Sequence, residues 1–154
     1  MNLNPAHQLS LYGHHYEFSN FIKLYENNKL PNKILMSGEK GIGKSTLAYH
    51  IINHILSYDE DYTYDTKNFK INQDNKSYKL ILNKTNPNFI LIDIGDEKKS
   101  IDINQIRDLI LTLNKSSFNT KPRLVLIDNI EYLNTNSVNA LLKILEEPND
   151  NIYF

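Results

Sequence analysis

The sequence predicts an α/β domain built on a parallel sheet. Short apolar runs at 33–36, 89–93 and 124–128 have the composition of buried strands, and each precedes a segment with the apolar spacing of a helix. This alternation favours a parallel sheet, because each helix carries the chain back before the next strand begins. Between the first run and its helix lies a glycine-rich loop, 38–45, of a kind that binds phosphate.

The size and composition of the chain exclude several classes of protein. Its 154 residues are enough for one domain with its own core. A formal net charge of −1 argues against a global basic field, so we expect any contact with DNA to be local or to run through partners. The chain has no cysteine, its first residues lack the pattern of a signal peptide, and its apolar runs are too short for a membrane span. We therefore expect a soluble, cytoplasmic protein.

Two amphipathic helices are predicted in the N-terminal half. Residues 17–28 place four apolar side chains on one helical face, namely Phe18, Phe21, Ile22 and Tyr25. Residues 46–56, directly after the glycine-rich loop, repeat apolar side chains at helical spacing. Strand, loop and helix in this order form the arrangement that a phosphate-binding loop requires.

The stretch that follows is polar and leaves alternatives open. Residues 57–76 are rich in Asp, Tyr, Thr, Asn and Lys, and we expect an exposed connection, either disordered or folded as an ordered insert. Residues 74–83 fit either a short helix capped by Asp74 or a strand at 78–82, and we favour the helix.

The second half of the chain continues the alternation of strands and helices. The runs 89–93 and 124–128 are apolar until their final aspartate, as expected of strands that are covered on both faces. Asp102 has the position of an N-cap for a helix that begins at Ile103. A further helix is predicted over 136–146.

The glycine-rich loop matches the phosphate-binding pattern G-x-x-x-x-G-K-[ST] at every specified position. Gly38 and Gly43 permit backbone conformations in which successive N–H groups point at phosphate oxygens. Lys44 supplies a cation to the outer phosphates, and the Ser45 hydroxyl can bind Mg²⁺. The predicted nucleotide-binding residues are Gly38, Glu39, Lys40, Gly41, Ile42, Gly43, Lys44, Ser45 and Thr46. We predict a nucleoside triphosphate site, with ATP and Mg²⁺ as ligands.

A second part of the nucleotide site is predicted at the end of the strand 124–128. Its last residue, Asp128, has the position of a carboxylate that holds Mg²⁺ directly or through water. Many related ATPases follow this aspartate with a glutamate that orients the attacking water, but here the position is Asn129. An amide cannot take a proton, and Glu131 is only a weak candidate to replace the base. We expect the chain to bind ATP better than it hydrolyses ATP.

The most distinctive motif lies in the last helix and reads Asn-Ala-Leu-Leu-Lys-Ile-Leu-Glu-Glu-Pro, at 139–148. With Leu11–His14 near the start and Leu30–Pro31 before the first strand, it makes the chain resemble the bacterial DNA polymerase III clamp-loader subunits, within the AAA+ ATPases. The resemblance runs from about residue 10 to the end. It favours the delta-prime branch over gamma/tau, because the chain lacks the zinc-binding cysteines and the Asp-Glu pair usual in gamma/tau.

This resemblance implies a fold, a function and a set of partners. The fold would be a P-loop NTPase (AAA+) three-layer sandwich with a central parallel sheet. The function would be that of a loader subunit that helps place a sliding clamp on primed DNA. Its partners would be the other loader subunits (gamma/tau and delta), the clamp and primed DNA, with no membrane involved.

The C-terminal residues suggest that the nucleotide-binding domain is incomplete. Residues 151–154 have the pattern of a fourth strand, and the sequence stops within it. We therefore expect a truncated polypeptide in which 1–154 are the first part of an AAA+ domain, with a polar insert at about 57–76. By resemblance, the sensor residue, the arginine finger, the lid and the collar would follow Phe154.

Three further features are interpreted as structural or peripheral. His50 and His54 have the spacing of a two-histidine metal face, but we expect them to be polar positions on the helix. We expect His14 and His15 to lie near the nucleotide base. Arg123 is expected to be a surface charge that flanks the strand.

Overall fold

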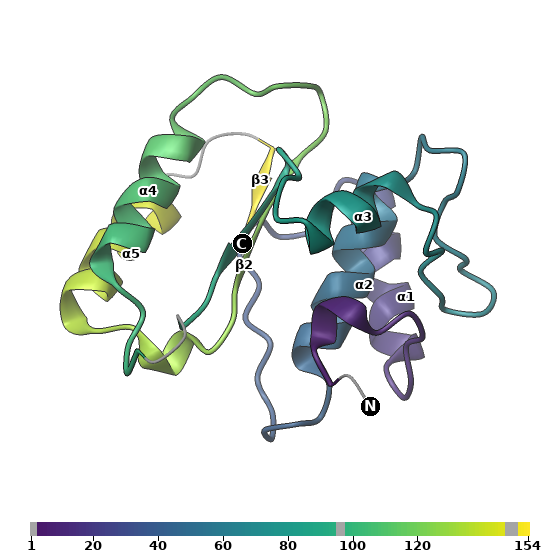
Figure 1. Cartoon of the computed structure of the whole chain (residues 1–154), viewed down its shortest axis with the longest axis horizontal. Coiled ribbons are helices and arrows are strands. Elements are labelled where there is room, and N and C mark those ends of the chain that lie inside the picture. Colours follow the sequence, from purple (N-terminus) through teal and green to yellow (C-terminus); the bar gives the residue numbers. More distant parts are fainter. Residues whose placement is uncertain (1–2, 95–97, 147–150) are drawn as a thin grey trace. The chain divides into compact units, whose positions relative to one another are not determined.

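The computed structural model describes residues 3–94, 98–146 and 151–154. The chain divides into two compact units, which are described separately (Figure 1). The first, here called the helical unit, comprises residues 1–31 and 35–86. The second, here called the sheet unit, comprises residues 32–34 and 87–154. Within the described ranges, no helix combines the length and apolar character needed to cross a bilayer.

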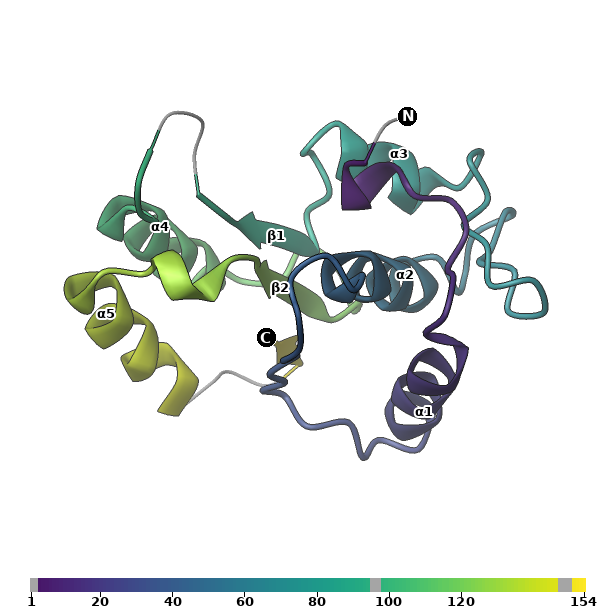
Figure 2. The same ribbon diagram turned by 90° about the horizontal axis from the view of Figure 1, so that it is seen from below.

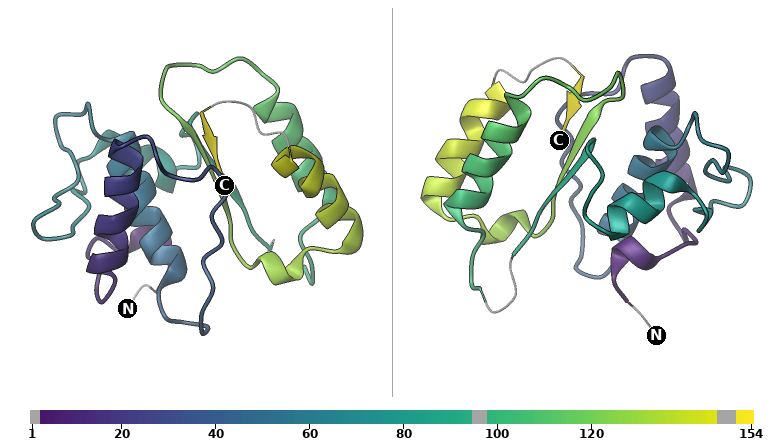
Figure 3. Two further views of the ribbon diagram at one scale, coloured as in Figure 1. Left: turned by 180° about the vertical axis from the view of Figure 1, so that it is seen from behind. Right: turned by 45° about the horizontal axis from the view of Figure 1, so that its top comes forward.

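Three helices and a short 3₁₀ turn account for the regular structure described in the helical unit. They are η1 (Pro5–His7), α1 (His15–Glu26), α2 (Lys44–Leu56) and α3 (Lys76–Leu82). The predicted helices 17–28 and 46–56 are confirmed as α1 and α2, each of which begins two residues earlier than predicted. Helix α2 packs against both α1 and α3, as two views of the ribbon show (Figure 3).

An aromatic cluster joins the polar tract 57–76 to helices α1 and α2. The ring of Phe18 stacks on Tyr64 with centroids 4.9 Å apart and meets Phe69 edge-on at 5.7 Å. Backbone hydrogen bonds of 2.8 and 3.0 Å between Asp65 and Lys70 close the turn that presents both rings. The tract is therefore an ordered insert, and the disordered alternative is wrong.

His50 lies in the core of the helical unit. Its side chain is fully buried, Nε2 donates to the Gln8 carbonyl at 3.0 Å, and Nδ1 accepts from the Tyr64 hydroxyl at 2.8 Å. His50 is a polar position on α2, as expected, but the sequence did not indicate its burial, because Tyr64 and Gln8, distant in sequence, supply a partner for each ring nitrogen. Burial lowers the pKa of His50 from 6.5 to about 4.

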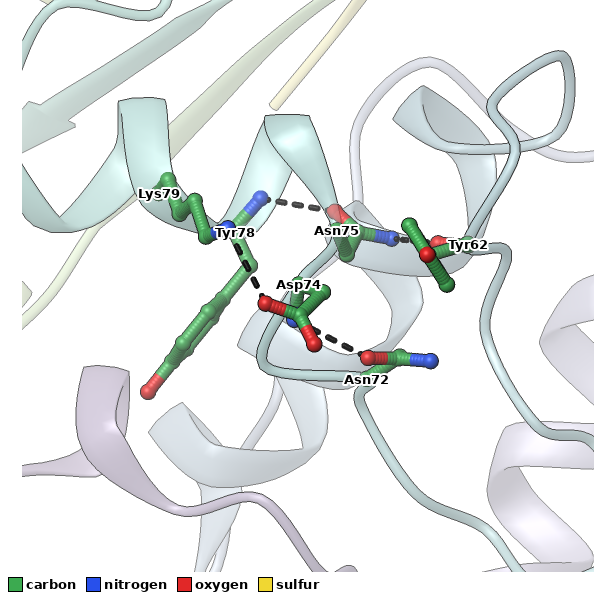
Figure 4. A network of polar contacts seen from close by, with 6 residues as sticks. All are labelled: Tyr62, Asn72, Asp74, Asn75, Tyr78 and Lys79. Atoms are coloured by element: carbon green, nitrogen blue, oxygen red, sulfur yellow. Dashed lines mark hydrogen bonds and ion pairs between the residues drawn. The ribbon is translucent and has the colours of Figure 1, made fainter.

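Helix α3 is capped by the residue after the predicted one. The Asn75 side-chain oxygen accepts from the Tyr78 N–H at 2.8 Å, and its amide donates to the Tyr62 carbonyl at 2.8 Å (Figure 4). Asp74 instead accepts from Lys79 Nζ at 3.2 Å. The helix prediction is confirmed and the strand alternative is wrong. Asp74 does not cap α3, because only the buried Asn75 has a donor for the insert as well as an acceptor for the helix.

The sheet unit contains the parallel sheet that the sequence predicts. Its strands are β1 (Phe89–Ile92), β2 (Arg123–Ile127) and β3 (Ile152–Tyr153), in the order β1-β2-β3 with both pairs parallel. Figure 2 shows β1 and β2 side by side. The register pairs Ile92 with Ile127, so β1 and β2 end level with each other.

Two helices pack together in the sheet unit, α4 (Ile103–Leu113) and α5 (Thr135–Glu146), visible in Figure 1. The predicted cap of α4 is confirmed, since the Asp102 side chain accepts from the Asn104 N–H at 2.9 Å. Ile106 and Leu109 of α4 and Leu141 of α5 are buried with sheet residues in one apolar cluster. The α/β class and the parallel sheet are confirmed, and the three-layer arrangement stays a prediction.

The expected strand at 33–36 is not a regular strand. The Phe154 N–H donates to the Asn32 carbonyl at 2.8 Å, and the Ile34 N–H donates to the Phe154 carbonyl at 2.9 Å. These two bonds have the pattern of a parallel pair, but Phe154 is the last residue of the sequence. No ladder hydrogen bond to Leu35 is described, and its side chain is 76% exposed.

Arg123 is a buried structural residue, so its interpretation as a flanking surface charge is wrong. Its side chain is only 9% exposed, and Nη1 donates to the carbonyls of Thr112 and Leu113, each at 3.0 Å. Nη2 donates to the Lys115 carbonyl and, at 3.1 Å, to Ser117 Oγ. The guanidinium thus donates to carbonyls in and just after the last turn of α4, where a cation also complements the helix dipole.

We expect Arg123→Ala to lower the free energy of unfolding by about 2–4 kcal/mol, because buried and partly buried carbonyls lose a charged donor. Arg123→Lys should recover only part of this loss, because a lysine lacks the planar fork that reaches several acceptors. Urea unfolding measures the change. Arg107→Ala is the control, because it removes an exposed arginine from α4, the helix whose C-terminal carbonyls Arg123 contacts. Equal effects of the Arg123→Ala and Arg107→Ala substitutions would contradict the capping role.

The buried His50 predicts a dependence of stability on pH. The unfolded chain binds a proton near pH 6.5, whereas the folded chain resists protonation of His50 until about pH 4. Stability should therefore be fully present above pH 6.5 and fall by about 3 kcal/mol as the pH drops to 4. Burial also lowers the pKa of His54, which acts in the same direction. Thermal unfolding from pH 7.5 to 4 tests this, and His50→Gln should flatten the slope.

Candidate functional site

The predicted phosphate loop lies in the helical unit and ends at the start of α2. Gly38 has φ +148° and Gly43 has φ +97°, conformations that side chains with a β-carbon rarely adopt. Gly43 is the N-cap residue of α2, so the loop leads directly into a helix N-terminus. Because the first N–H groups of a helix have no helical acceptor, this backbone can receive an anion.

The loop lysine lies along the loop itself. Lys44 Nζ donates to the Gly38 and Glu39 carbonyls, each at 2.8 Å. Ser45 and Thr46 follow in the first turn of α2 and are partly buried, whereas 38–42 are exposed. The nine predicted binding residues thus form one continuous segment, with its cation held over the loop and its hydroxyls at the helix start.

A histidine from outside the motif contacts the loop. His14 precedes α1, and its Nε2 lies 2.7 Å from the Ile42 carbonyl. His15 turns away from the loop: its Nε2 bonds the Leu11 carbonyl at 2.8 Å, and its ring stacks on Phe69 at 4.0 Å. The two adjacent histidines therefore differ in their contacts, and of the two only His14 is described with a bond to the loop.

The carboxylate predicted to hold the metal, Asp128, lies in the sheet unit at the carboxyl end of β2, beside the carboxyl end of β1. The Asp128 N–H donates to the Ile92 carbonyl at 2.9 Å, which continues the parallel ladder beyond β2. Asp93, the first residue after β1, therefore lies across from Asp128. The carboxyl ends of parallel strands are where ligands bind in open α/β sheets.

Asn129 joins these two strand ends. Its side-chain amide donates to Asp93 Oδ1 at 2.8 Å, and its N–H donates to Asp128 Oδ1 at 2.9 Å. Asn129 has φ +56°, a left-handed conformation that asparagine tolerates better than most residues. Glu131 is exposed in the 3₁₀ turn η2 (Ile130–Tyr132) and is described with no such bond to Asp93 or Asp128.

Asp93 is a site residue that the sequence-based prediction missed. Its signal is present in the sequence, because the runs 89–93 and 124–128 both finish with aspartate after four apolar residues. In neighbouring parallel strands of equal register, such residues must meet. That Asp128 and Ser45 share one Mg²⁺ stays a prediction.

Comparison with known proteins identifies a family. The family model described as "DNA polymerase III, delta subunit" matches residues 13–154. A protein of Buchnera aphidicola (subsp. Baizongia pistaciae) named DNA polymerase III subunit delta' is 29% identical over 160 aligned residues, covering all of this chain and 44% of that protein. Its namesake in Pseudomonas aeruginosa is 31% identical over 114 residues, covering 74% of this chain and 33% of that protein.

A second kind of subunit is also similar. A Mycoplasma genitalium protein named DNA polymerase III subunit gamma/tau is 30% identical over 128 residues, covering 82% of this chain and 20% of that protein. The chain spans less than half the length of each of these three relatives. Of the distinctive motif at 139–148, Glu147 and Pro148 lie outside the described residues.

The bond between Asn129 and Asp93 predicts the effect of a nearly isosteric change. Asn129→Asp removes the donor and pairs a further carboxylate with Asp93, near that of Asp128, so the fold should lose about 1–3 kcal/mol at pH 7.5 through the lost bond and charge repulsion. Part of the loss should be recovered at pH 5, where the pair can share a proton. Thermal unfolding at both pH values measures this.

Asn134→Asp provides the matched control for this substitution. The Asn134 side chain accepts from the Ser137 N–H at 2.9 Å at the start of α5, and an aspartate there keeps the acceptor and complements the helix dipole. We expect it to be neutral or stabilising. A stability of Asn129→Asp that equals that of the unsubstituted chain at pH 7.5 would contradict the role of the amide donor.

Proposed function

The chain belongs to the DNA polymerase III delta-prime family, and on that premise we propose that it is a clamp-loader subunit that binds ATP with Mg²⁺ during DNA replication. The observation that carries the proposal is the complete phosphate loop, with Gly43 left-handed at the start of α2 and Lys44 above the loop. The phosphates of a bound nucleotide would lie at the loop N–H groups. They would take the place of the Gly38 and Glu39 carbonyls as hydrogen-bond acceptors of Lys44.

The proposed metal site combines a hydroxyl with a carboxylate. Ser45 would bind Mg²⁺ from the loop, and Asp128 would hold it from the end of β2, which gives the hard oxygen ligands that Mg²⁺ prefers. The position of Asp128 at the carboxyl end of a parallel strand supports this assignment. ATP is the expected nucleotide because of the family.

Hydrolysis by this subunit is proposed to be slow. Asn129 stands where related ATPases carry the carboxylate that orients water, and its amide is engaged with Asp93. Loss of a general base typically costs about 10²–10⁴-fold in rate. The subunit would therefore hold its nucleotide as part of an assembly interface, and the neighbouring motor subunits would perform the turnover.

The assembly in which it would act follows from the family. Gamma/tau and delta subunits would be its direct partners, and the sliding clamp and primed DNA would be reached through the assembled loader in the cytoplasm. The alternative is a hydrolysing, gamma/tau-like motor subunit, which the similarity to the Mycoplasma genitalium protein favours. Lys44-dependent ATP turnover separates the two functions.

We predict that Lys44→Ala weakens ATP binding at least tenfold, because the phosphates lose their cation in the loop. Isothermal titration of the chain with ATP and Mg²⁺ measures the affinity. Lys23→Ala, which removes an exposed lysine from α1, is the control and should leave the affinity unchanged.

Turnover is measured on the same proteins, alone and after mixing with gamma/tau and delta subunits. The proposal expects no phosphate release attributable to this subunit, so the Lys44→Ala chain and the unsubstituted chain should give equal rates when each is alone. Clear Lys44-dependent hydrolysis would favour the motor function instead. Absence of ATP binding by the unsubstituted chain would refute the proposal.

A further inference from the structure

His14 is a side chain from outside the motif that hydrogen-bonds the phosphate loop. Its Nε2 lies 2.7 Å from the Ile42 carbonyl. A carbonyl oxygen can only accept, so Nε2 carries the proton in this bond. The other ring nitrogen, Nδ1, lies 3.8 Å from Glu17 Oε2, one turn further along α1.

This bond fixes the orientation of a single peptide group. The Ile42 carbonyl and the Gly43 N–H belong to the same planar trans peptide, so they point in opposite directions. If His14 holds the Ile42 oxygen on one side of the peptide, the Gly43 N–H must face the other side. A phosphate loop needs this outcome, because its N–H groups bind the anion and its carbonyls must be turned away from it.

The imidazole also packs against the next residue of the loop. A β-carbon placed on Gly43 would meet His14 Cδ2 and Nε2, each at 3.5 Å, which is ordinary van der Waals distance. The ring therefore lies alongside the left-handed Gly43, at φ +97°, as well as bonding the carbonyl before it. Glycine is flexible, so an outside contact is an effective way to select one of its conformations.

We propose that His14 is a positioning residue of the nucleotide site, which holds the peptide between Ile42 and Gly43 so that its N–H faces the phosphates. The inference rests on the proposed function, since it concerns the same loop. It replaces the expectation that His14 lies near the nucleotide base. His14 acts through the loop and makes no contact of its own with the ligand.

Two variants of His14 distinguish the contribution of its N–H donor from that of its aromatic ring. His14→Phe keeps an aromatic ring beside Gly43 but has no N–H to donate. His14→Gln keeps an N–H at a similar reach. His15→Phe is the matched control, because it removes a bond of the same kind, to the Leu11 carbonyl, that lies away from the loop.

Two phosphate probes, ATP with Mg²⁺ and tripolyphosphate with Mg²⁺, are titrated into each chain. His14→Phe should weaken both by the same factor, about tenfold, which corresponds to one hydrogen bond. His14→Gln should recover most of the loss, and His15→Phe should change neither affinity. A loss confined to ATP would indicate a contact with the base and would overturn the inference, as would unchanged affinities for both probes in His14→Phe.

A second readout does not depend on binding. In the nucleotide-free chain, ¹⁵N relaxation should show lower order parameters at Ile42 and Gly43 in His14→Phe than in the unsubstituted chain, and no such change in His15→Phe. If the unsubstituted chain binds neither probe, the proposed function fails and this comparison still decides the role of His14. Order parameters that stay equal in His14→Phe would overturn the inference in either case.

Discussion

The N–H groups at the start of α2 are the constraint on which the candidate site depends. A helix N-terminus leaves these donors without acceptors, and the loop before it must be shaped so that they converge on one anion. Gly43 provides the left-handed turn into the helix, and His14 binds the carbonyl of the peptide that contains the Gly43 N–H. Lys44 bonds loop carbonyls at 2.8 Å, which keeps its ammonium over the same backbone. In the proposed site, this backbone geometry and the Lys44 ammonium together would bind the phosphates.

In the sheet unit, strand register and an asparagine determine how the acidic residues are arranged. Equal register of β1 and β2 brings Asp93 level with Asp128, and Asn129 donates to the carboxylates of both. These bonds neutralise part of the repulsion between two nearby acids and occupy the amide at the position where a catalytic carboxylate is usual. This arrangement supports the proposal that the subunit retains a nucleotide rather than hydrolysing it.

The sequence was sufficient for features that depend on nearby residues. The glycine turn into α2 and the Asp102 cap depend on residues close in sequence, so their patterns predicted these conformations correctly, while nucleotide binding by 38–45 stays a prediction. The burial of Arg123 and His50 could not be predicted, because the hydrogen-bond partners of these side chains lie from six to 42 residues away in the sequence and come close only after folding. The segment 33–36 has the composition of a strand, but composition does not show which segment will pair with it. Its described pairing consists of the hydrogen bonds of Asn32 and Ile34 to Phe154. Asp93 is an intermediate case. Its place at the end of an apolar run could be seen in the sequence, but its position beside Asp128 follows only from the register of β1 and β2.

The proposed Mg²⁺ site requires one nucleotide–metal complex to be bound by both Ser45 of the loop and Asp128 after β2. Mn²⁺ in place of Mg²⁺ tests it, because a paramagnetic ion broadens the NMR signals of nuclei close to it. We expect Mn²⁺ with ATP to broaden the backbone amide signals of both Ser45 and Asp128, and Lys44→Ala to abolish both effects at the same ligand concentration. Broadening at Ser45 with an unchanged signal at Asp128 would contradict the shared metal site.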